Sequence, residues 1–245
     1  MTQGGLSLLS RWVSKLPEFV RRAFQYDQME LDSALAQMYL LCVKPSLISK
    51  MSKARKMTKN HYYRDDPAFI VLQAFSSVIT TVAYGLALGS GFLQILYNVI
   101  YTVFFDYFIT GALVTTALWL FANHCMMGTN RVQDVGREVD WRYSFDVHCN
   151  GYFPYFMWTK VFHYILLPLI FHGPLLGRLI GNCLHTIGFV AYSYITFVGY
   201  LELPMLVQQQ RLMYPVPIVI LFMLLVTLFT SWSTSYWSLS RDWYR

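Results

Sequence analysis

Long apolar runs, separated by short polar or turn-forming segments, dominate the chain after residue 66. The first of them, residues 67–105, contains no Asp, Glu, Lys or Arg. A helix that crosses a bilayer needs about 20 predominantly apolar residues. The pattern predicts five membrane-spanning helices, at about residues 68–88, 92–121, 147–171, 176–201 and 216–232.

The composition agrees with a membrane protein and excludes an ordinary soluble domain. Hydrophobic residues make up 56% of the 245 residues and charged residues only 13%, whereas about 25% of a soluble domain is charged. A transmembrane β-barrel would instead show short segments of alternating hydrophobicity. We therefore expect an all-α, polytopic membrane protein, with residues 67–245 as its membrane domain.

Residues 1–66 follow a different pattern, which predicts three amphipathic helices before the first span. Apolar residues recur every three or four positions within residues 6–16, 28–43 and 46–59, with polar or basic residues opposite them. This spacing is typical of amphipathic helices. We interpret residues 1–66 as a basic amphipathic helical segment in the cytosol or at the membrane interface.

The distribution of basic residues predicts the orientation of the chain. Residues 1–66 hold 11 of the 19 Lys and Arg residues, and the polar loop 123–146 holds three more. Cytosolic segments carry an excess of Lys and Arg. With five spans, the N-terminus is expected in the cytosol and the C-terminus in the lumen. Aromatic residues near the C-terminus are expected to anchor it at the luminal interface: Trp232, Tyr236, Trp237, Trp243 and Tyr244.

A basic cluster just before the first span is the candidate surface for a partner or for lipid. Its residues are Lys50, Lys53, Arg55, Lys56 and Lys59. Close to an anionic membrane each basic residue contributes on the order of 1 kcal/mol. RNA binding through residues 44–64 is the alternative, since His61, Tyr62 and Tyr63 lie beside these charges and aromatic rings can stack on bases.

The motif Arg64-Asp65-Asp66-Pro67 marks the junction between the basic segment and the first span. Proline is favoured at the first position of a helix, and acidic residues are favoured near its N-terminus. We expect Arg64 to pair with one of the two acids or with a lipid phosphate. We interpret the motif as a structural junction that fixes where the first span begins.

Two ionisable residues lie inside predicted spans. Asp106 is near the middle of the second span and Lys160 is near the middle of the third. Neighbouring antiparallel helices could bring them together as a mutually neutralising structural pair. The alternative is a functional pair, as in a small transporter or a lipid-handling protein.

The remaining polar motifs predict neither catalysis nor metal binding. Asp146, His148 and Cys149 are close in sequence, but residues two apart do not share a helix face. Asp146 is instead expected to cap or charge the start of the third span. The sequence contains no phosphate-binding loop and no nucleophile motif. We therefore expect a non-enzymatic protein without a cofactor or metal.

The chain also resembles a known family through several motifs. They are Arg21-Arg22-Ala23-Phe24-Gln25-Tyr26-Asp27-Gln28-Met29, Thr58-Lys59-Asn60, Tyr63-Arg64-Asp65-Asp66-Pro67-Ala68-Phe69, Asp140-Trp141, Phe145-Asp146-Val147-His148, Asn150, Pro154, Gly181-Asn182, Thr196-Phe197-Val198-Gly199-Tyr200, Pro204 and Tyr214-Pro215. Over roughly residues 20–235 the sequence resembles the UNC-fifty family.

This resemblance implies a five-span Golgi membrane protein with a cytosolic N-terminus. The family is associated with large Arf guanine-nucleotide exchange factors, with vesicle-mediated transport and with cell-surface delivery of nicotinic receptors. RNA binding is attributed to a mammalian member. The resemblance carries no catalytic residues, and it favours recruitment of an Arf exchange factor over transport or RNA binding.

Overall fold

The computed structural model describes residues 18–23, 27, 29–128 and 138–243. Every regular element among them is a helix, which confirms the all-α fold class. The helix predicted within residues 6–16 lies outside the described residues. The first described helix, α2 (Glu18–Ala23), is short.

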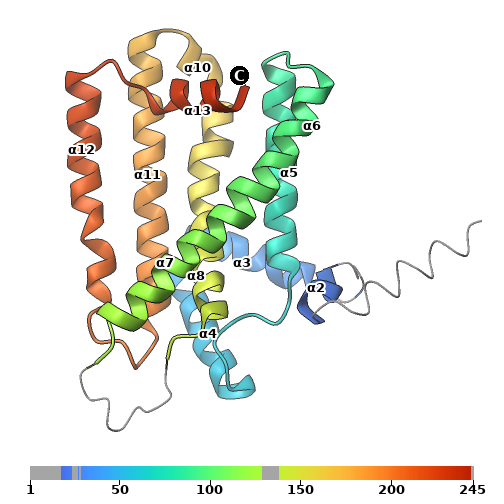
Figure 1. Ribbon diagram of the computed structural model, residues 1–245, viewed down its shortest axis with the longest axis vertical. Coiled ribbons are helices and arrows are strands. Elements are labelled where there is room, and N and C mark those ends of the chain that lie inside the picture. The colour runs from blue at the N-terminus through green and yellow to red at the C-terminus, as the bar shows by residue number, and fades with distance from the viewer. Residues whose placement is uncertain (1–17, 24–26, 28, 129–137, 244–245) are drawn as a thin grey trace, which may run out of the picture.

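Four helices of the described part are long and apolar enough to cross a membrane. They are α5 (Ala68–Ala87), the continuous helix formed by α6 (Phe92–Tyr101), η2 (Thr102–Ile109) and α7 (Thr110–Cys125), α11 (Pro174–Leu201), and η4 (Gln209–Met213) with α12 (Pro215–Phe229). Figure 1 shows the helix 92–125 crossing the others obliquely. Its 34 residues would measure about 51 Å at 1.5 Å per residue, so the tilt reduces the depth that it spans.

The predicted third span, 147–171, is divided into shorter helices. They are α8 (Trp141–Phe156), η3 (Met157–Phe162), α9 (His163–Ile165) and α10 (Leu167–Phe171). Pro154 lies inside α8 and lacks a backbone donor, and η3 is a π-helix. The helix also begins earlier than the apolar run, because the Asp140 side chain accepts a 2.8 Å hydrogen bond from the Arg142 backbone nitrogen and caps α8.

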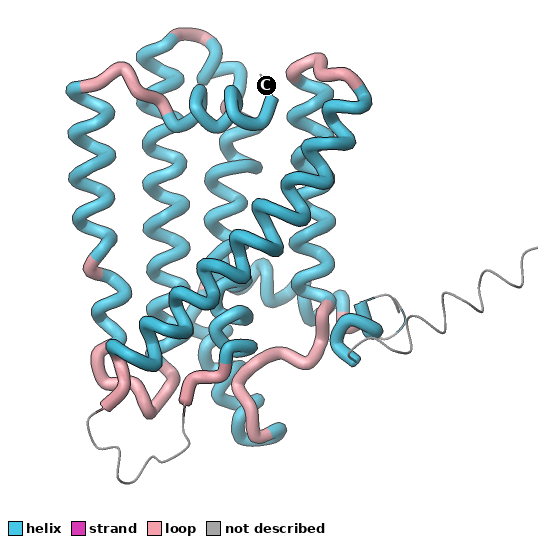
Figure 2. The backbone as a smooth tube through the Cα atoms, viewed as in Figure 1, coloured by secondary structure: helices cyan, strands magenta, loops and turns pink. Residues whose placement is uncertain are grey.

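At one end of the bundle lie α3 (Leu31–Val43) and α4 (Pro45–Lys59) (Figure 1). The apolar face of α3 packs onto the bundle, where Met38 and Leu41 meet Phe69 and Cys149. The sequence predicts an apolar stripe on α4 of Leu47, Ile48, Met51 and Ala54, but of these only Ile48 is buried. Ser49 and Ser52 are buried beside it, whereas Leu47, Met51 and Ala54 are exposed. The loop between α4 and α5 runs back from the far end of α4 to the foot of α5 (Figure 2).

At the opposite end, α13 (Thr234–Trp243) lies across the bundle (Figure 1). Its side chains Leu239 and Trp243 are buried with Tyr84 and Leu167. The expected aromatic anchor at the C-terminus is therefore wrong for Trp243, because a helix with apolar residues four apart buries that face. Trp232, Tyr236 and Trp237 are exposed, and Tyr244 lies outside the described residues.

Candidate functional site

Arg64 lies at the centre of a polar cluster that joins α3, α5 and α8. Its guanidinium donates hydrogen bonds of 2.5 Å to Asp146 Oδ1, 2.5 Å to Asn150 Oδ1 and 2.8 Å to Gln37 Oε1. It also lies 4.1 Å from the centre of the Phe69 ring. One side chain therefore holds the segment before α5 against three helices, which suits the planar, multiply donating guanidinium.

Asp146 is the acid of this cluster and binds a second arginine. Its Oδ2 lies 3.3 Å from Arg55 of α4, and its side chain is only 7% exposed. Burial lowers the pKa of Arg64, and the negative charge of Asp146 opposes that change. Arginine stays protonated because its ordinary pKa is above about 12. The buried carboxylate is thus matched by two permanent cations.

These contacts correct two expectations. Asp146 neither caps nor begins a helix, since α8 begins at Trp141 and its cap is Asp140. Arg64 pairs with Asp146 rather than with its neighbouring acids or a lipid phosphate. The two residues are 82 positions apart, so local sequence patterns could not reveal their approach.

The two acids after Arg64 have different partners. Asp65 pairs with Lys59 at 2.6 Å and lies 3.3 Å from His61 Nε2. Asp66 accepts from the backbone nitrogen of Ala68 at 2.9 Å and from that of Glu30 at 2.6 Å. Its carboxylate therefore satisfies donors at the N-termini of both α5 and α3. Pro67 is buried and immediately precedes α5.

The predicted basic cluster is divided by its contacts. Arg55 turns inward to Asp146, and Lys56 binds the oxygens of Asn60 at the C-terminus of α4. Lys59 pairs with Asp65. Lys50 is exposed, and the side chain of Lys53 is 64% exposed, 3.9 Å from Glu202.

The aromatic residues of the RNA-binding alternative make contacts within the protein. The rings of His61 and Tyr63 stack with centres 4.2 Å apart. Tyr62 packs on Tyr143 with ring centres 5.5 Å apart, and Arg142 lies over the ring of Tyr63. Each of the three rings therefore has a partner within the protein.

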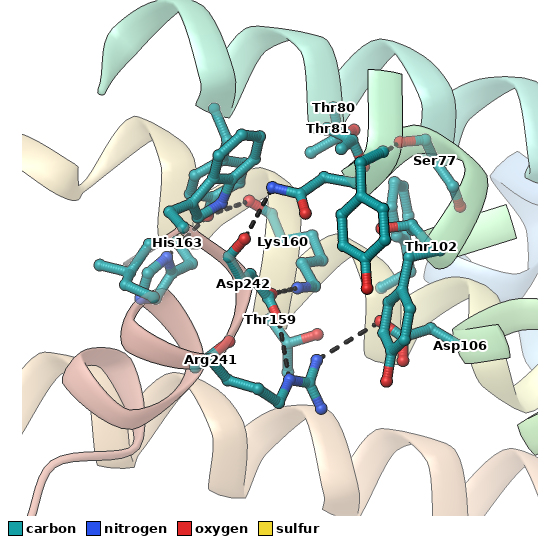
Figure 3. Close-up of a pocket in the computed structure, with 18 of the residues that line it drawn as sticks. Ser77, Thr80, Thr81, Thr102, Asp106, Thr159, Lys160, His163, Arg241 and Asp242 are labelled. Atoms are coloured by element: carbon teal, nitrogen blue, oxygen red, sulfur yellow. Dashed lines mark hydrogen bonds and ion pairs between the residues drawn. The ribbon is translucent and has the colours of Figure 1, made fainter. Parts of the chain in front are cut away.

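A second site lies under α13, where a cavity of about 370 Å³ is lined by residues of α5, α6, η2, α8, η3, α9 and α13. Figure 3 shows Asp106 and Lys160 at its wall. They do not form the expected direct pair. Asp106 binds Arg241 at 3.4 Å, Lys160 binds Asp242 at 3.2 Å, and Arg241 binds Asp242 at 2.7 Å.

The sequence interpretation missed Arg241 and Asp242, because the C-terminal segment was interpreted as an aromatic anchor. The available signal was the set of charges: the predicted spans contained the acid Asp106 and the bases Lys160 and Arg178, and the tail contained one further acid, Asp242, beside Arg241 and Arg245. A chain of four alternating charges is more stable than isolated ones in an apolar setting.

Residues with the chemistry of metal ligands are dispersed in the part of the chain that the structure describes. No group of three His, Cys, Asp or Glu side chains is placed there to hold a metal ion. His148 Nδ1 lies 2.9 Å from the hydroxyl of Tyr192, while Asp146 is bound by the two arginines.

Comparisons with known proteins agree with these motifs. The profile of the UNC-50 (UNC-fifty) family matches residues 19–241. The chain is 35% identical to "Protein unc-50 homolog" of Dictyostelium discoideum, over 91% of this chain and 85% of that protein. It is 35% identical to "Protein unc-50" of Caenorhabditis elegans, over 93% and 72% of the two chains.

The human "Protein unc-50 homolog" is 33% identical, over 85% of this chain and 80% of that protein. No solved structure gives a significant match. The matched region includes the Arg64 cluster and the residues that line the cavity, except Asp242 and Trp243. The chain belongs to the UNC-50 family.

Proposed function

We propose that the chain is a non-enzymatic Golgi membrane protein that supports vesicle-mediated trafficking. In this proposal its N-terminal helices face the cytosol and recruit a large Arf guanine-nucleotide exchange factor, and its C-terminus faces the lumen. Recruitment in turn aids cell-surface delivery of membrane receptors. Membership of the UNC-50 family and the basic N-terminal segment support this assignment.

The outer face of α4 is the observation that carries the proposal. We define this face as Leu47, Lys50, Met51, Ala54 and Met57, all of which are exposed. Residues at these spacings share one face of a helix. Met57 is 83% exposed, and Leu47 and Met51 are also exposed on the same face; contiguous exposed apolar residues are typical of an interaction site. Flexible apolar side chains beside a basic residue suit a partner with an apolar groove and an acidic rim.

The opposite face of α4 is fixed to the bundle, so the outer face remains accessible to a partner. Ile48 and Ser52 are buried, and Arg55 forms an ion pair with Asp146 of α8. Figure 1 shows α4 extending beyond the foot of the membrane helices. A partner held there searches for its membrane substrate in two dimensions, and its own lipid contacts then add to the affinity.

Binding of the purified exchange factor to the full chain in nanodiscs tests this proposal. The nanodiscs should contain only zwitterionic lipid, so that direct attraction of the exchange factor to anionic lipid is absent. We expect the double variant Lys50→Glu and Met51→Asp to bind about tenfold more weakly, a loss of about 1.4 kcal/mol. Glu138→Lys, an exposed charge change, is the matched control and should bind normally.

Failure of the wild-type nanodiscs to bind the exchange factor would contradict the proposal. Equal binding by the double variant would contradict the assignment to the outer face of α4. A parallel titration with RNA separates the alternative function, because RNA affinity falls steeply as salt rises. Tight, salt-sensitive RNA binding without exchange-factor binding would favour that alternative.

A further inference from the structure

Two π-helical segments contribute to the wall of the cavity under α13. Asp106 belongs to η2 and Lys160 belongs to η3. π-Helical turns are rare and occur frequently at functional sites. Ionisable residues within membrane helices are also uncommon and mark binding sites or pathways. Both features occur twice around this one cavity.

The four charges of the cavity alternate in sign and balance one another. Their order is Asp106, Arg241, Asp242 and Lys160. Asp106 and Lys160, at the two ends of this chain of charges, each have one ion partner. Each can make further hydrogen bonds, because an ammonium has three donors and a carboxylate has several acceptor positions. The two ends therefore offer a cation and an anion to the same ligand.

The hydroxyl groups on α5 add acceptor oxygens to the wall. Thr80 donates its proton to the Ser76 carbonyl at 2.8 Å, and Thr81 donates to the Ser77 carbonyl at 2.8 Å. Thr159 of η3 donates in the same way to Tyr155. Because their protons are used within the helices, these hydroxyls can only accept hydrogen bonds from a ligand. They suit a ligand with ammonium protons.

The cavity reaches the outer surface along α6. Tyr97 lines the cavity and is 57% exposed. Leu93, Leu96 and Ile100 surround it on the same helix and are also exposed. An apolar face of a membrane helix next to a polar cavity suits an amphipathic molecule, with its polar part inside and its hydrocarbon outside. A cavity of about 370 Å³ is at the small end of ligand pockets, which fits a head group.

We propose that this cavity binds the head group of a zwitterionic phospholipid. The phosphate would lie near Lys160 and Arg241, and the ammonium near Asp106 and the threonine oxygens of α5. The acyl chains would lie along the exposed face of α6. The helix α13 forms the roof, and Asn98 of α6 holds it by donating a 2.6 Å hydrogen bond to the carbonyl of Asp242.

Lipid binding to the purified, delipidated full chain tests the proposal. The probes are phosphatidylethanolamine, phosphatidylcholine and phosphatidylglycerol with the same acyl-chain fluorophore. We expect phosphatidylethanolamine to bind about tenfold more tightly than phosphatidylglycerol, because it supplies ammonium protons for Asp106 and the threonine oxygens. Phosphatidylcholine should bind with intermediate affinity, because its quaternary ammonium offers a charge for Asp106 but no N–H for the threonine oxygens. Equal binding of all three lipids, or no binding, would overturn the proposal.

Two isosteric variants should change the lipid preference in a way that a purely structural role would not. Asp106→Asn leaves a net positive cavity, which should shift the preference toward phosphatidylglycerol. Lys160→Met leaves a net negative cavity, which should weaken phosphatidylglycerol binding most. Lys53→Met, an exposed residue of α4, is the matched control and should keep the wild-type order. An unchanged order in both cavity variants would overturn the proposal.

A third variant keeps the test decisive if loss of a charge prevents folding. Thr80→Leu adds volume to the cavity wall without changing any charge, and we expect it to reduce zwitterionic lipid binding about tenfold. Normal binding by a folded Thr80→Leu protein would count against the cavity as the site.

Free phosphoethanolamine separates a lipid from a soluble ligand with the same chemistry. The acyl chains of the lipid bury apolar surface that the free head group lacks, so the free head group should fail to displace the lipid at equal concentration. Displacement at equal concentration would overturn the lipid assignment and identify a site for a soluble zwitterion.

Discussion

Arg64 donates a 2.5 Å hydrogen bond to Asp146, which lies 82 residues further along the chain. Their side chains are only 10% and 7% exposed. Through this pair the loop before α5 is joined to α8, and Arg55 extends the link to α4. The helices proposed to bind a partner are thus fixed to the membrane helices by buried charges.

Removing the charge of Arg64 should destabilise the protein strongly. Arg64→Met leaves Asp146 buried with only Arg55 as its cationic partner, and breaking a buried ion pair costs about 3–5 kcal/mol. Arg64→Lys should also destabilise, because one ammonium cannot reach Asp146, Asn150 and Gln37 together. Thermal unfolding of the full chain in detergent measures both effects.

The control for these variants is Lys50→Met, which removes an exposed charge. Surface substitutions of this kind change stability by at most about 0.5 kcal/mol. If Arg64→Met unfolds at the same temperature as Lys50→Met, the structural role of the Arg64 cluster is wrong.

Asp66 should stabilise two helix N-termini at once. Asp66→Ala removes the acceptor for the backbone nitrogens of Ala68 and Glu30, and loss of one helix cap costs about 1 kcal/mol. We expect a loss of about 2 kcal/mol for the two caps, and a smaller loss for Asp66→Asn, which keeps one acceptor. Unchanged unfolding, Golgi location and partner recruitment in Asp66→Ala would refute this role.

Four of the five predicted spans and the amphipathic α3 could be predicted because their signals are local. An apolar run of sufficient length specifies a membrane helix wherever it packs, and the spacing of Ala34, Met38 and Leu41 specifies one buried face. The start of α8 also had a local signal, since Asp140 is a favourable cap residue before Trp141. The apolar run alone predicted a start at about residue 147, later than the observed start of α8 at Trp141.

The polar contacts could not be predicted, because they join residues from distant parts of the chain. Asp146 had two plausible local roles, and only the fold places it beside Arg55 and Arg64. Asp106 and Lys160 were correctly identified as unusual, but their partners come from α13. The C-terminal segment contains the necessary charges, yet nothing in its local pattern indicates that it folds back over the bundle.

The close approach of α11 to α13 depends on a glycine. A methyl group at Gly181 would overlap the side chain of Ser235, and overpacking costs about 1–3 kcal/mol. Gly181→Ala should therefore lower stability and displace α13. Gly91→Ala is the matched control, since nothing lies within 4 Å of the added methyl group. Equal unfolding temperatures for the two variants would show that α13 does not need this approach.

The pair between Lys160 and Asp242 should be energetically coupled. Asp242→Asn leaves Lys160 and Arg241 without their shared acid, and we expect each single variant to lose about 1–3 kcal/mol. The double variant Lys160→Met and Asp242→Asn should lose less than the sum of the two. A double-mutant cycle measures the coupling, and additive losses would mean that the ion pair contributes nothing.

The central claim is that the outer face of α4 holds an Arf exchange factor at the Golgi membrane. The most direct measurement is the amount of exchange factor on Golgi membranes of cells whose only copy of this protein is the double variant Lys50→Glu and Met51→Asp. We predict that recruitment falls several-fold, while the abundance and Golgi location of the variant match those of the wild type. Normal recruitment by a correctly located variant would contradict the claim.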